Sequence, residues 1–196
     1  MGYDVSAALK AYTPWNEQEA RDRDIMLAAL DARPDPFTRE NEVMHFSASS
    51  WIVNRDFTKV LMAYHNIYQA WAWTGGHADG ERDLLAVAVR EAREETGVHA
   101  VPMTGEIFSL EILTVDGHEK RGRYVPSHLH LNVTYLLAAD ENEALRSKAD
   151  ENAAVRWFTP DEALNSSVEK WMVQRVYSKL NQKAGEWKAA GSGQKK

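Results

Sequence analysis

One amphipathic segment, DLLAVAVREAREETG (83–97), constrains the fold more than any other part of the chain. Asp83 stands where a helix N-cap belongs, and Gly97 stands where a glycine commonly ends a helix. At about 100° per residue, apolar and small side chains gather on one face of this helix. The segment therefore predicts a helix that packs one face against a core, and the residues of that face are Leu85, Val89, Ala92 and Thr96.

Three carboxylates, Glu91, Glu94 and Glu95, fall within about 100° of one another on a different face, directed away from the core. Like charges so close together repel, and the C-terminal end of a helix disfavours negative charge. A compensating partner is therefore expected, and dense hard oxygen ligands suit Mg²⁺ or Mn²⁺. The alternative is a solvated face on which Arg90 and Arg93 balance the charge.

Strand-like segments lie on both sides of this helix, and a charged loop, DGHEKRGRYVPS (116–127), is expected among them. Strands followed by a helix, further strands and a last helix predict an α+β fold with a mixed central sheet covered by helices. The expected strands are 44–53, 59–65 and 68–73 before the helix, and 106–115, 128–139 and 153–158 after it.

The remaining parts of the chain are expected to be helical or flexible. Asn16 followed by Glu19 resembles a capping box, and Thr159 followed by Pro160 is typical of a helix start. The predicted organisation is an N-terminal helical extension (1–41), a central domain (42–165), a C-terminal helix packed on the same domain (166–187) and a flexible tail (188–196).

The composition excludes several classes of function. The chain has no cysteine, which removes disulfides, thiolate metal sites and cysteine nucleophiles. A net charge of −6 gives no basic footprint for a nucleic acid polymer. No segment approaches the roughly twenty apolar residues that cross a membrane, and the start lacks the pattern of a secretory signal. A cytoplasmic protein with a small-molecule partner is expected, and a homodimer is left open.

The string GGHADGERDLLAVAVREAREETGV (75–98) resembles the Nudix box, and its second half, REAREETGV, matches that motif at every fixed residue. The resemblance covers roughly residues 42–165 and implies a Nudix-like α/β/α sandwich with a mixed central sheet. The first half departs from the motif, because Arg82 stands where the family has a glutamate and Glu81 comes one residue early.

The resemblance also implies a reaction, namely hydrolysis of a diphosphate linkage in a nucleoside diphosphate derivative or similar organic pyrophosphate. The cofactor would be Mg²⁺ or Mn²⁺, and the base that activates water varies within the family. Glu151 fits the position of a loop glutamate that often assists the activation of water in the family. Its position also fits a surface carboxylate without a catalytic role. The implied site residues are Arg90, Glu94 and Glu151 for catalysis, Glu91, Glu94, Glu95 and the carbonyl near Gly75 for the metal, and Glu81 as uncertain support for Arg90.

Three histidines and two tryptophans are weaker candidates for binding substrate. His128 and His130 alternate on one predicted strand and therefore share a face. This arrangement fits either two ligands for a metal or phosphate or two buried, hydrogen-bonded residues of the strand. His77 lies within the box. Trp71 and Trp73 also share a face, which fits either a stacking surface for a nucleobase or core packing.

Two other functional classes are alternatives to a Nudix hydrolase. Isopentenyl diphosphate isomerase shares the fold but depends on a catalytic cysteine, which this chain lacks. A Nudix-like domain that binds a nucleotide and regulates without hydrolysis is the alternative, and the three retained glutamates favour the enzyme. No residue pattern names the substrate.

Overall fold

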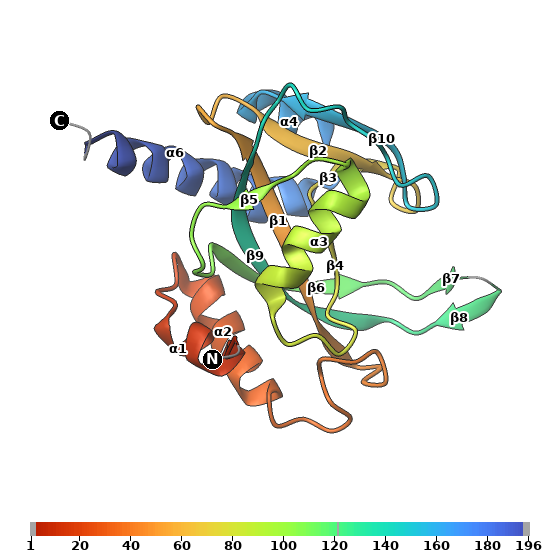
Figure 1. Ribbon diagram of the computed structural model, residues 1–196. Helices are drawn as coiled ribbons and strands as arrows, with labels where there is room; N and C mark the ends of the chain where they lie inside the picture. Colours follow the sequence, from red (N-terminus) through yellow and green to blue (C-terminus); the bar gives the residue numbers. More distant parts are fainter. Residues whose placement is uncertain (1–2, 121, 194–196) are drawn as a thin grey trace. The chain divides into compact units, whose positions relative to one another are not determined.

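The computed structural model describes residues 3–120 and 122–193 of the chain (Figure 1). The helices are α1 (Val5–Ala11), α2 (Glu17–Ala29), α3 (Leu84–Thr96), α4 (Pro160–Ser166), α5 (Lys170–Met172), the π-helical turn η1 (Val173–Tyr177) and α6 (Ser178–Gly193). The strands are β1 (Met44–Asn54), β2 (Val60–His65), β3 (Ala70–Ala72), β4 (Thr74–His77), β5 (Val101–Pro102), β6 (Ser109–Val115), β7 (His118–Lys120), β8 (Arg123–Val125), β9 (His128–Ala139) and β10 (Asn152–Phe158).

The long strands form the sheet that the sequence predicts. Hydrogen bonding follows the order β10-β2-β1-β9-β5, with β3 beside β2, β4 beside β1 and β6 beside β9. Strands precede and follow α3, and helices stand at both ends of the chain. The expected α+β class with a mixed central sheet is therefore confirmed.

The chain divides into two compact units that alternate along the sequence. The first unit contains Met1–Ser49, Gly75–Ala88 and Gly105–Tyr135, and the second contains Ser50–Thr74, Val89–Thr104 and Leu136–Lys196. Strands β1 and β9 and helix α3 therefore each contribute residues to both units. The boundaries expected at residues 41 and 165 stay predictions.

In the first unit, α1 packs against α2, and α2 packs against β6. The side chain of Asn16 caps α2 by accepting a hydrogen bond from the backbone N–H of Glu19 at 2.9 Å. The buried Glu19 carboxylate accepts from the Tyr12 hydroxyl at 2.7 Å and from the Ser109 hydroxyl on β6 at 2.9 Å. A buried acidic side chain thus ties the N-terminal helices to a strand.

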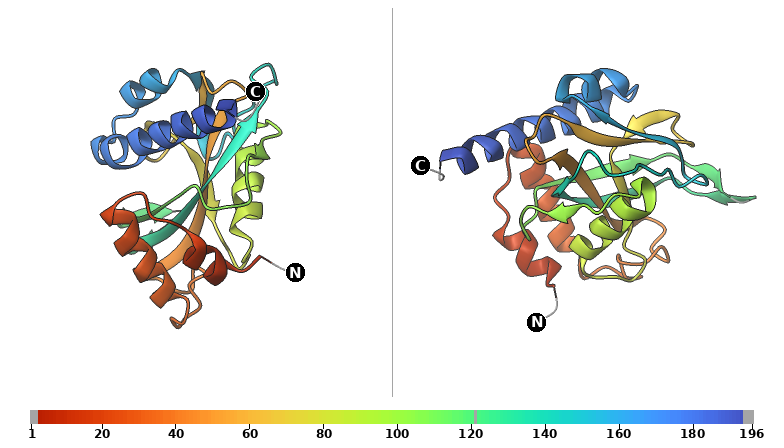
Figure 2. Two further views of the ribbon diagram at one scale, coloured as in Figure 1. Left: turned by 90° about the vertical axis from the view of Figure 1, so that its left-hand side faces the viewer. Right: turned by 45° about the horizontal axis from the view of Figure 1, so that its top comes forward.

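The hairpin of β7 and β8 corrects the expectation of a loop over 116–127. His118 pairs with Val125, and Glu119 pairs with Tyr124. In Figure 2 this hairpin extends away from β6 and β9, the strands that lead into and out of it. Its strands are short and largely exposed, so they need no buried face and show none of the apolar alternation that sequence patterns detect.

In the second unit, β2 lies between β10 and β3, and the stacked rings of Trp51 and Tyr177 lie in its core, 5.5 Å apart. Thr159 caps α4 with a full capping box and Pro160 follows it, as predicted. The C-terminal helix begins at Lys170 rather than at residue 166, and it includes a π turn. Residues 188–193, expected as flexible, continue α6, while 194–196 lie outside the described residues.

None of the helices within the described residues has the length and apolar content that crossing a membrane requires.

Candidate functional site

Helix α3 carries the predicted carboxylates and has the predicted ends. The Asp83 carboxylate accepts from the Ala86 backbone N–H at 3.0 Å, which caps the helix, and Gly97 ends it with a φ of 79°. The buried face is rotated from the expected one, because Leu85 and Val89 are only half-buried. Its buried members are Leu84, Val87, Ala88, Ala92, Glu95 and Thr96.

Glu95 therefore does not point away from the core, as the sequence suggested, but lies within it at 5% exposure. A buried carboxylate is costly without hydrogen bonds. The side-chain amide of Asn152, the first residue of β10, donates to Glu95 Oε2 at 2.8 Å. This contact explains how a glutamate of the cluster is held in the interior of the second unit.

The remaining glutamates of α3 are bound by cationic side chains. Arg90 donates to Glu91 Oε1 at 2.9 Å and also lies 3.9 Å from Glu94 Oε1. Glu91 is mostly buried and Glu94 is half exposed. Arg90 thus contacts two of the three predicted carboxylates, and its role in orienting them for catalysis stays a prediction.

Lys148 joins α3 to the loop before β10. Its ammonium lies 3.2 Å from Glu94 and 3.0 Å from Glu151. Partial burial lowers the pKa of Lys148, but the two carboxylates outweigh burial and hold that pKa above its ordinary value. The structure therefore brings Glu151 to the same ammonium as Glu94, and a catalytic role for Glu151 stays a prediction.

The donors around α3 have the chemistry of ligands for a hard divalent cation, although within the described residues the converging group of ligand atoms is formed by four histidines and not by Glu91, Glu94 and Glu95. Asn152 is fully buried, and its Oδ1 has no hydrogen-bond partner. A buried amide oxygen without a partner is destabilising unless a ligand satisfies it. Carboxylate and amide oxygens are the ligands that Mg²⁺ and Mn²⁺ accept, so this donor set suits the predicted cofactor.

Gly75 lies in the first unit, on β4. A Cβ at this position would fall 2.7 Å from the carbonyl oxygen of Ala48 and closer still to the hydroxyl of Ser49. Only glycine allows the backbone of β4 to approach β1 so closely. A role for the Gly75 carbonyl as a metal ligand alongside the glutamates stays a prediction.

The residues of the shifted loop contact other partners. Glu81 Oε1 accepts from the backbone N–H of Asp83 at 2.8 Å, at the start of α3. Arg82, at the position of the family glutamate, pairs with Asp35 at 2.6 Å and lies over the ring of Phe37. Support of Arg90 by Glu81 stays a prediction.

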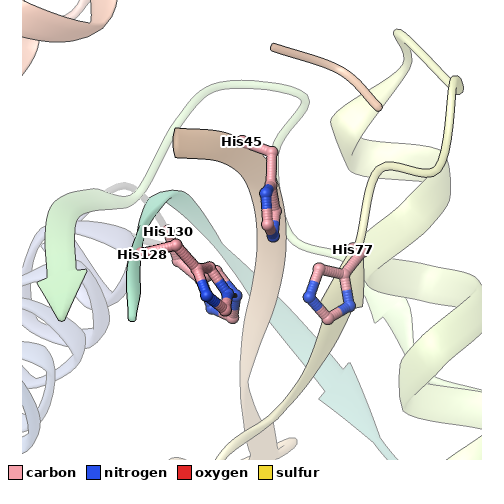
Figure 3. A group of neighbouring side chains, drawn as sticks. All are labelled: His45, His77, His128 and His130. Carbon is pink, nitrogen blue, oxygen red and sulfur yellow. Dashed lines mark hydrogen bonds between the residues drawn. The ribbon is translucent and has the colours of Figure 1, made fainter. Parts of the chain in front are cut away.

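The predicted histidines meet a fourth one, His45 of β1, in the first unit. Figure 3 shows His45, His77, His128 and His130 pointing toward one another. Each offers a ligand atom, and these atoms all lie within 4.8 Å of one another. The two histidines of β9 share a face, as expected, with their Nε2 atoms 3.2 Å apart.

The charge state of this histidine cluster follows from its burial. Burial and then the His77, His45 and His128 imidazoles lower the pKa of His130 from 6.5 to about 2. Burial also lowers the pKa of His45, although its hydrogen bond to Asn41 acts in the opposite direction. These two rings are therefore neutral at physiological pH.

Trp71 and Trp73 have separate neighbours in the second unit. Trp71 packs edge-on against Phe158 at 4.9 Å and Tyr64 at 5.5 Å, and Trp73 packs edge-on against Tyr177 at 5.7 Å. Both rings are half-buried, so packing accounts for much of each surface. Contact between Trp73 and a substrate stays a prediction.

Sequence reasoning missed three residues of these sites, namely His45, Lys148 and Asn152. For His45 a signal was present, because His45, Ser47 and Ser49 alternate along β1 and give a buried strand one polar face. The signals for Lys148 and Asn152 were weak. A lysine in a charged loop and an asparagine at a strand start are common surface residues.

Comparison with known proteins gives one family match, in which the model of the NUDIX domain covers residues 43–179. A probable DHNTP pyrophosphohydrolase from Lactococcus lactis subsp. cremoris is 28% identical over 104 residues, covering 53% of this chain and 60% of the relative. An asymmetrical bis(5'-nucleosyl)-tetraphosphatase from Mus musculus is 32% identical over 106 residues, covering 53% of this chain and 65% of the relative. The chain thus spans less than two thirds of the length of these curated relatives.

Two solved structures show the same fold at low sequence identity. A NUDIX-family hydrolase from Clostridium perfringens matches with a TM-score of 0.51 and 19% identity, covering 70% of this chain and 97% of the other. The E. coli dihydroneopterin triphosphate pyrophosphohydrolase matches with a TM-score of 0.51 and 16% identity, covering 70% and 92%.

Proposed function

The chain belongs to the Nudix family, and from this membership together with the carboxylates of α3 we propose that it hydrolyses a diphosphate linkage with the help of a divalent cation. The substrate class is a nucleoside diphosphate derivative or a similar organic pyrophosphate. The observation that carries the proposal is the contact between Glu95 and Asn152, where a buried carboxylate adjoins a buried amide oxygen that lacks a partner.

Glu91, Glu94 and Glu95 are the residues that would hold Mg²⁺ or Mn²⁺, with the Gly75 carbonyl as a further ligand. A bound cation supplies charge neutralisation on the phosphates and lowers the pKa of a water molecule. The chain contributes the positions of its own groups. Arg90 fixes Glu91 through a hydrogen bond of 2.9 Å, and Asn152 fixes Glu95 through one of 2.8 Å.

Glu151 is the group that we assign to the proton of the attacking water, with Glu94 as the other candidate. A general base must lie within hydrogen-bond reach of that proton, and a loop carboxylate can reach a bound substrate from outside the helix. Lys148 keeps Glu151 close to α3 by binding it and Glu94 together. Removal of Glu151 therefore affects turnover in this proposal more than it affects binding.

The names of the relatives narrow the compounds to test. The Lactococcus protein is named for DHNTP, the E. coli structure for dihydroneopterin triphosphate, and the mouse protein for a bis(5'-nucleosyl) tetraphosphate. We therefore propose a panel that contains dihydroneopterin triphosphate, a bis(5'-nucleosyl) tetraphosphate and nucleoside diphosphate conjugates.

A homodimer stays an open possibility for the oligomeric state.

A regulatory domain that binds a nucleotide without hydrolysing it is the competing function. Such a domain needs no acidic metal ligands. Burying the Glu95 carboxylate beside Asn152 would then destabilise the protein without serving its function. The three glutamates retained on α3 support the proposal of hydrolysis.

The test compares the parent protein with Glu95→Gln, Glu91→Gln and the matched control Glu186→Gln, which changes an exposed carboxylate on α6. Product formation from the panel is measured with Mg²⁺ and with Mn²⁺. We expect the two α3 variants to lose most activity, because each removes a charged ligand, while the control keeps it. Mg²⁺ should also raise the melting temperature of the parent and control more than that of either α3 variant. Nucleotide binding without turnover in every protein would instead support the regulatory domain.

A further inference from the structure

We propose that His45, His77, His128 and His130 form a second metal site, built from nitrogen ligands and suited to a transition-metal cation such as Zn²⁺. The four side chains come from β1, from the end of β4 and from the start of β9, all within the first unit (Figure 3). Their ligand atoms lie within 4.8 Å of one another. Hydrolysis of a diphosphate does not require this site, and the proposal goes beyond that function.

Hydrogen bonds to the backbone orient two of the imidazoles. His45 Nδ1 lies 3.0 Å from the carbonyl oxygen of Asn41, and His128 Nδ1 lies 2.8 Å from that of Pro126. A carbonyl oxygen only accepts, so each Nδ1 carries the proton and donates. In a neutral ring the Nε2 atom is then left with a lone pair, and this is the arrangement that second partners impose on metal-binding histidines.

The lone pair on His45 Nε2 accepts no hydrogen bond within the described residues. His45 is 4% exposed, and its Nε2 atom is buried without a hydrogen-bond partner. Burying a polar atom in this way costs stability unless a ligand satisfies it. Because His128 Nδ1 carries the proton, His128 Nε2 accepts the 3.2 Å hydrogen bond from His130 Nε2, and a cation bound by both atoms would replace the proton between them.

The charges near the cluster favour neutral ligands over a protonated anion site. Asp79, the carboxylate that acts on His45, is already bound by Arg39 through two contacts of 2.7 Å. Arg39 thus offsets the negative charge of Asp79 that would otherwise favour an imidazolium at His45. Metals bind neutral imidazole, whereas phosphate is bound best by the protonated form, so the cluster suits a cation.

The identity of the cation follows from the ligand type and the spacing. Imidazole nitrogens suit zinc, cobalt, nickel and copper, whereas Mg²⁺ prefers oxygen ligands. Four ligands around Zn²⁺ lie about 3.4 Å apart when each bond is about 2.1 Å. The ligand atoms of the cluster now lie within 4.8 Å of one another, so the widest of these distances must shorten to reach that geometry. Four protein ligands leave no open position, which is typical of a structural rather than a catalytic zinc site.

The experiment starts from protein dialysed against a chelator and then titrated with Zn²⁺ or Co²⁺ alone. We expect one cation per chain and the visible absorption of tetrahedral Co²⁺. The melting temperature should rise by about 5–10 °C at roughly a hundredfold excess over Kd. His45→Gln and His130→Gln should weaken binding at least tenfold, while the control His99→Gln, which alters an exposed histidine outside the cluster, should bind as the parent does.

Three further measurements separate the proposal from a folding defect and from the hydrolase site. Nitrogen NMR of the unaltered protein should show Zn²⁺ shifting one ring-nitrogen signal of each of the four clustered histidines, which is Nε2 in His45 and His128, and no ring-nitrogen signal of His65, His99 or His118. Glu95→Gln should keep Zn²⁺ binding, and millimolar Mg²⁺ should not displace Zn²⁺. Equal Zn²⁺ binding in His45→Gln and the parent, or stabilisation by inorganic phosphate that depends on His130, would overturn the metal site.

Discussion

The side-chain amide of Asn152 lies 2.8 Å from Oε2 of Glu95, and both residues are buried, at 0% and 5% exposure. A residue from the start of β10 thus sets the position of a carboxylate on α3. The other polar atom of the amide, Oδ1, is buried without a hydrogen-bond partner.

Substituting Asn152 should separate loss of the hydrogen bond from gain of charge. Asn152→Asp places a second carboxylate beside Glu95, so unfolding in urea without metal should show a loss of about 2–4 kcal/mol. Mg²⁺ should recover much of this loss, because a cation neutralises both groups. Asn152→Leu should also destabilise the protein but gain no more from Mg²⁺ than the parent does. Equal recovery in the two variants would contradict a cation at this position.

Glu151→Gln tests the loop carboxylate as a base. We expect kcat to fall at least tenfold, as about one to three orders of magnitude is usual for a lost acid–base group, while KM stays within a few fold. Asp150→Asn, one residue away, is the control and should keep kcat. A kcat near the parent value in Glu151→Gln would leave this residue as a surface carboxylate.

Lys148→Gln tests the ammonium shared by Glu94 and Glu151. Removing a positive charge beside the carboxylates should lower the Mg²⁺ concentration that gives half-maximal activity, since the lysine competes with the cation. The partly exposed pairs should cost only about 0–1 kcal/mol of stability without metal. Lys10→Gln, which changes an exposed lysine on α1, should leave the Mg²⁺ requirement unchanged. A higher requirement in Lys148→Gln would show that the lysine assists metal binding.

Glu81→Gln should cost clearly less activity than Glu95→Gln. Glu81 contacts the backbone at the start of α3, where an amide oxygen can still accept the hydrogen bond from Asp83. Steady-state rates of the two variants, measured side by side, decide the matter. Comparable losses would show that the shifted loop brings Glu81 into the role of the family glutamate.

Glu19→Leu should destabilise the protein by about 2–4 kcal/mol, because the Tyr12 and Ser109 hydroxyls lose a buried charged acceptor. Urea unfolding measures the change, and Glu17→Leu, which alters an exposed residue of the same helix, is the control. Equal stabilities would mean that the N-terminal helices contribute little to the first unit.

The sequence predicted those parts of the fold that local chemistry determines. Helix α3 begins after Asp83 and ends before Gly97 because a carboxylate cap and a positive φ act within one turn. Strands β1, β2 and β9 also match their expected ranges closely, since each is rich in the β-branched, aromatic and other apolar residues typical of strands. Local signals of this kind need no knowledge of the tertiary structure.

The rest depends on contacts between distant segments. The burial of Glu95 could not be predicted, because its partner Asn152 comes from another element. Sequence placed His128 and His130 on one face, but only the pairing of strands brings His45 and His77 to them. The β7–β8 hairpin lacked a buried face and so had no periodicity to detect.

The histidine cluster has a consequence for how this protein could be stabilised in a cell. Residues 45, 77 and 128 are far apart along a chain that contains no cysteine, so no disulfide can join their strands. A cation held by the four imidazoles would act as a removable cross-link between them. The strength of that cross-link would follow the supply of free metal instead of the thiol–disulfide balance that governs cystine bonds.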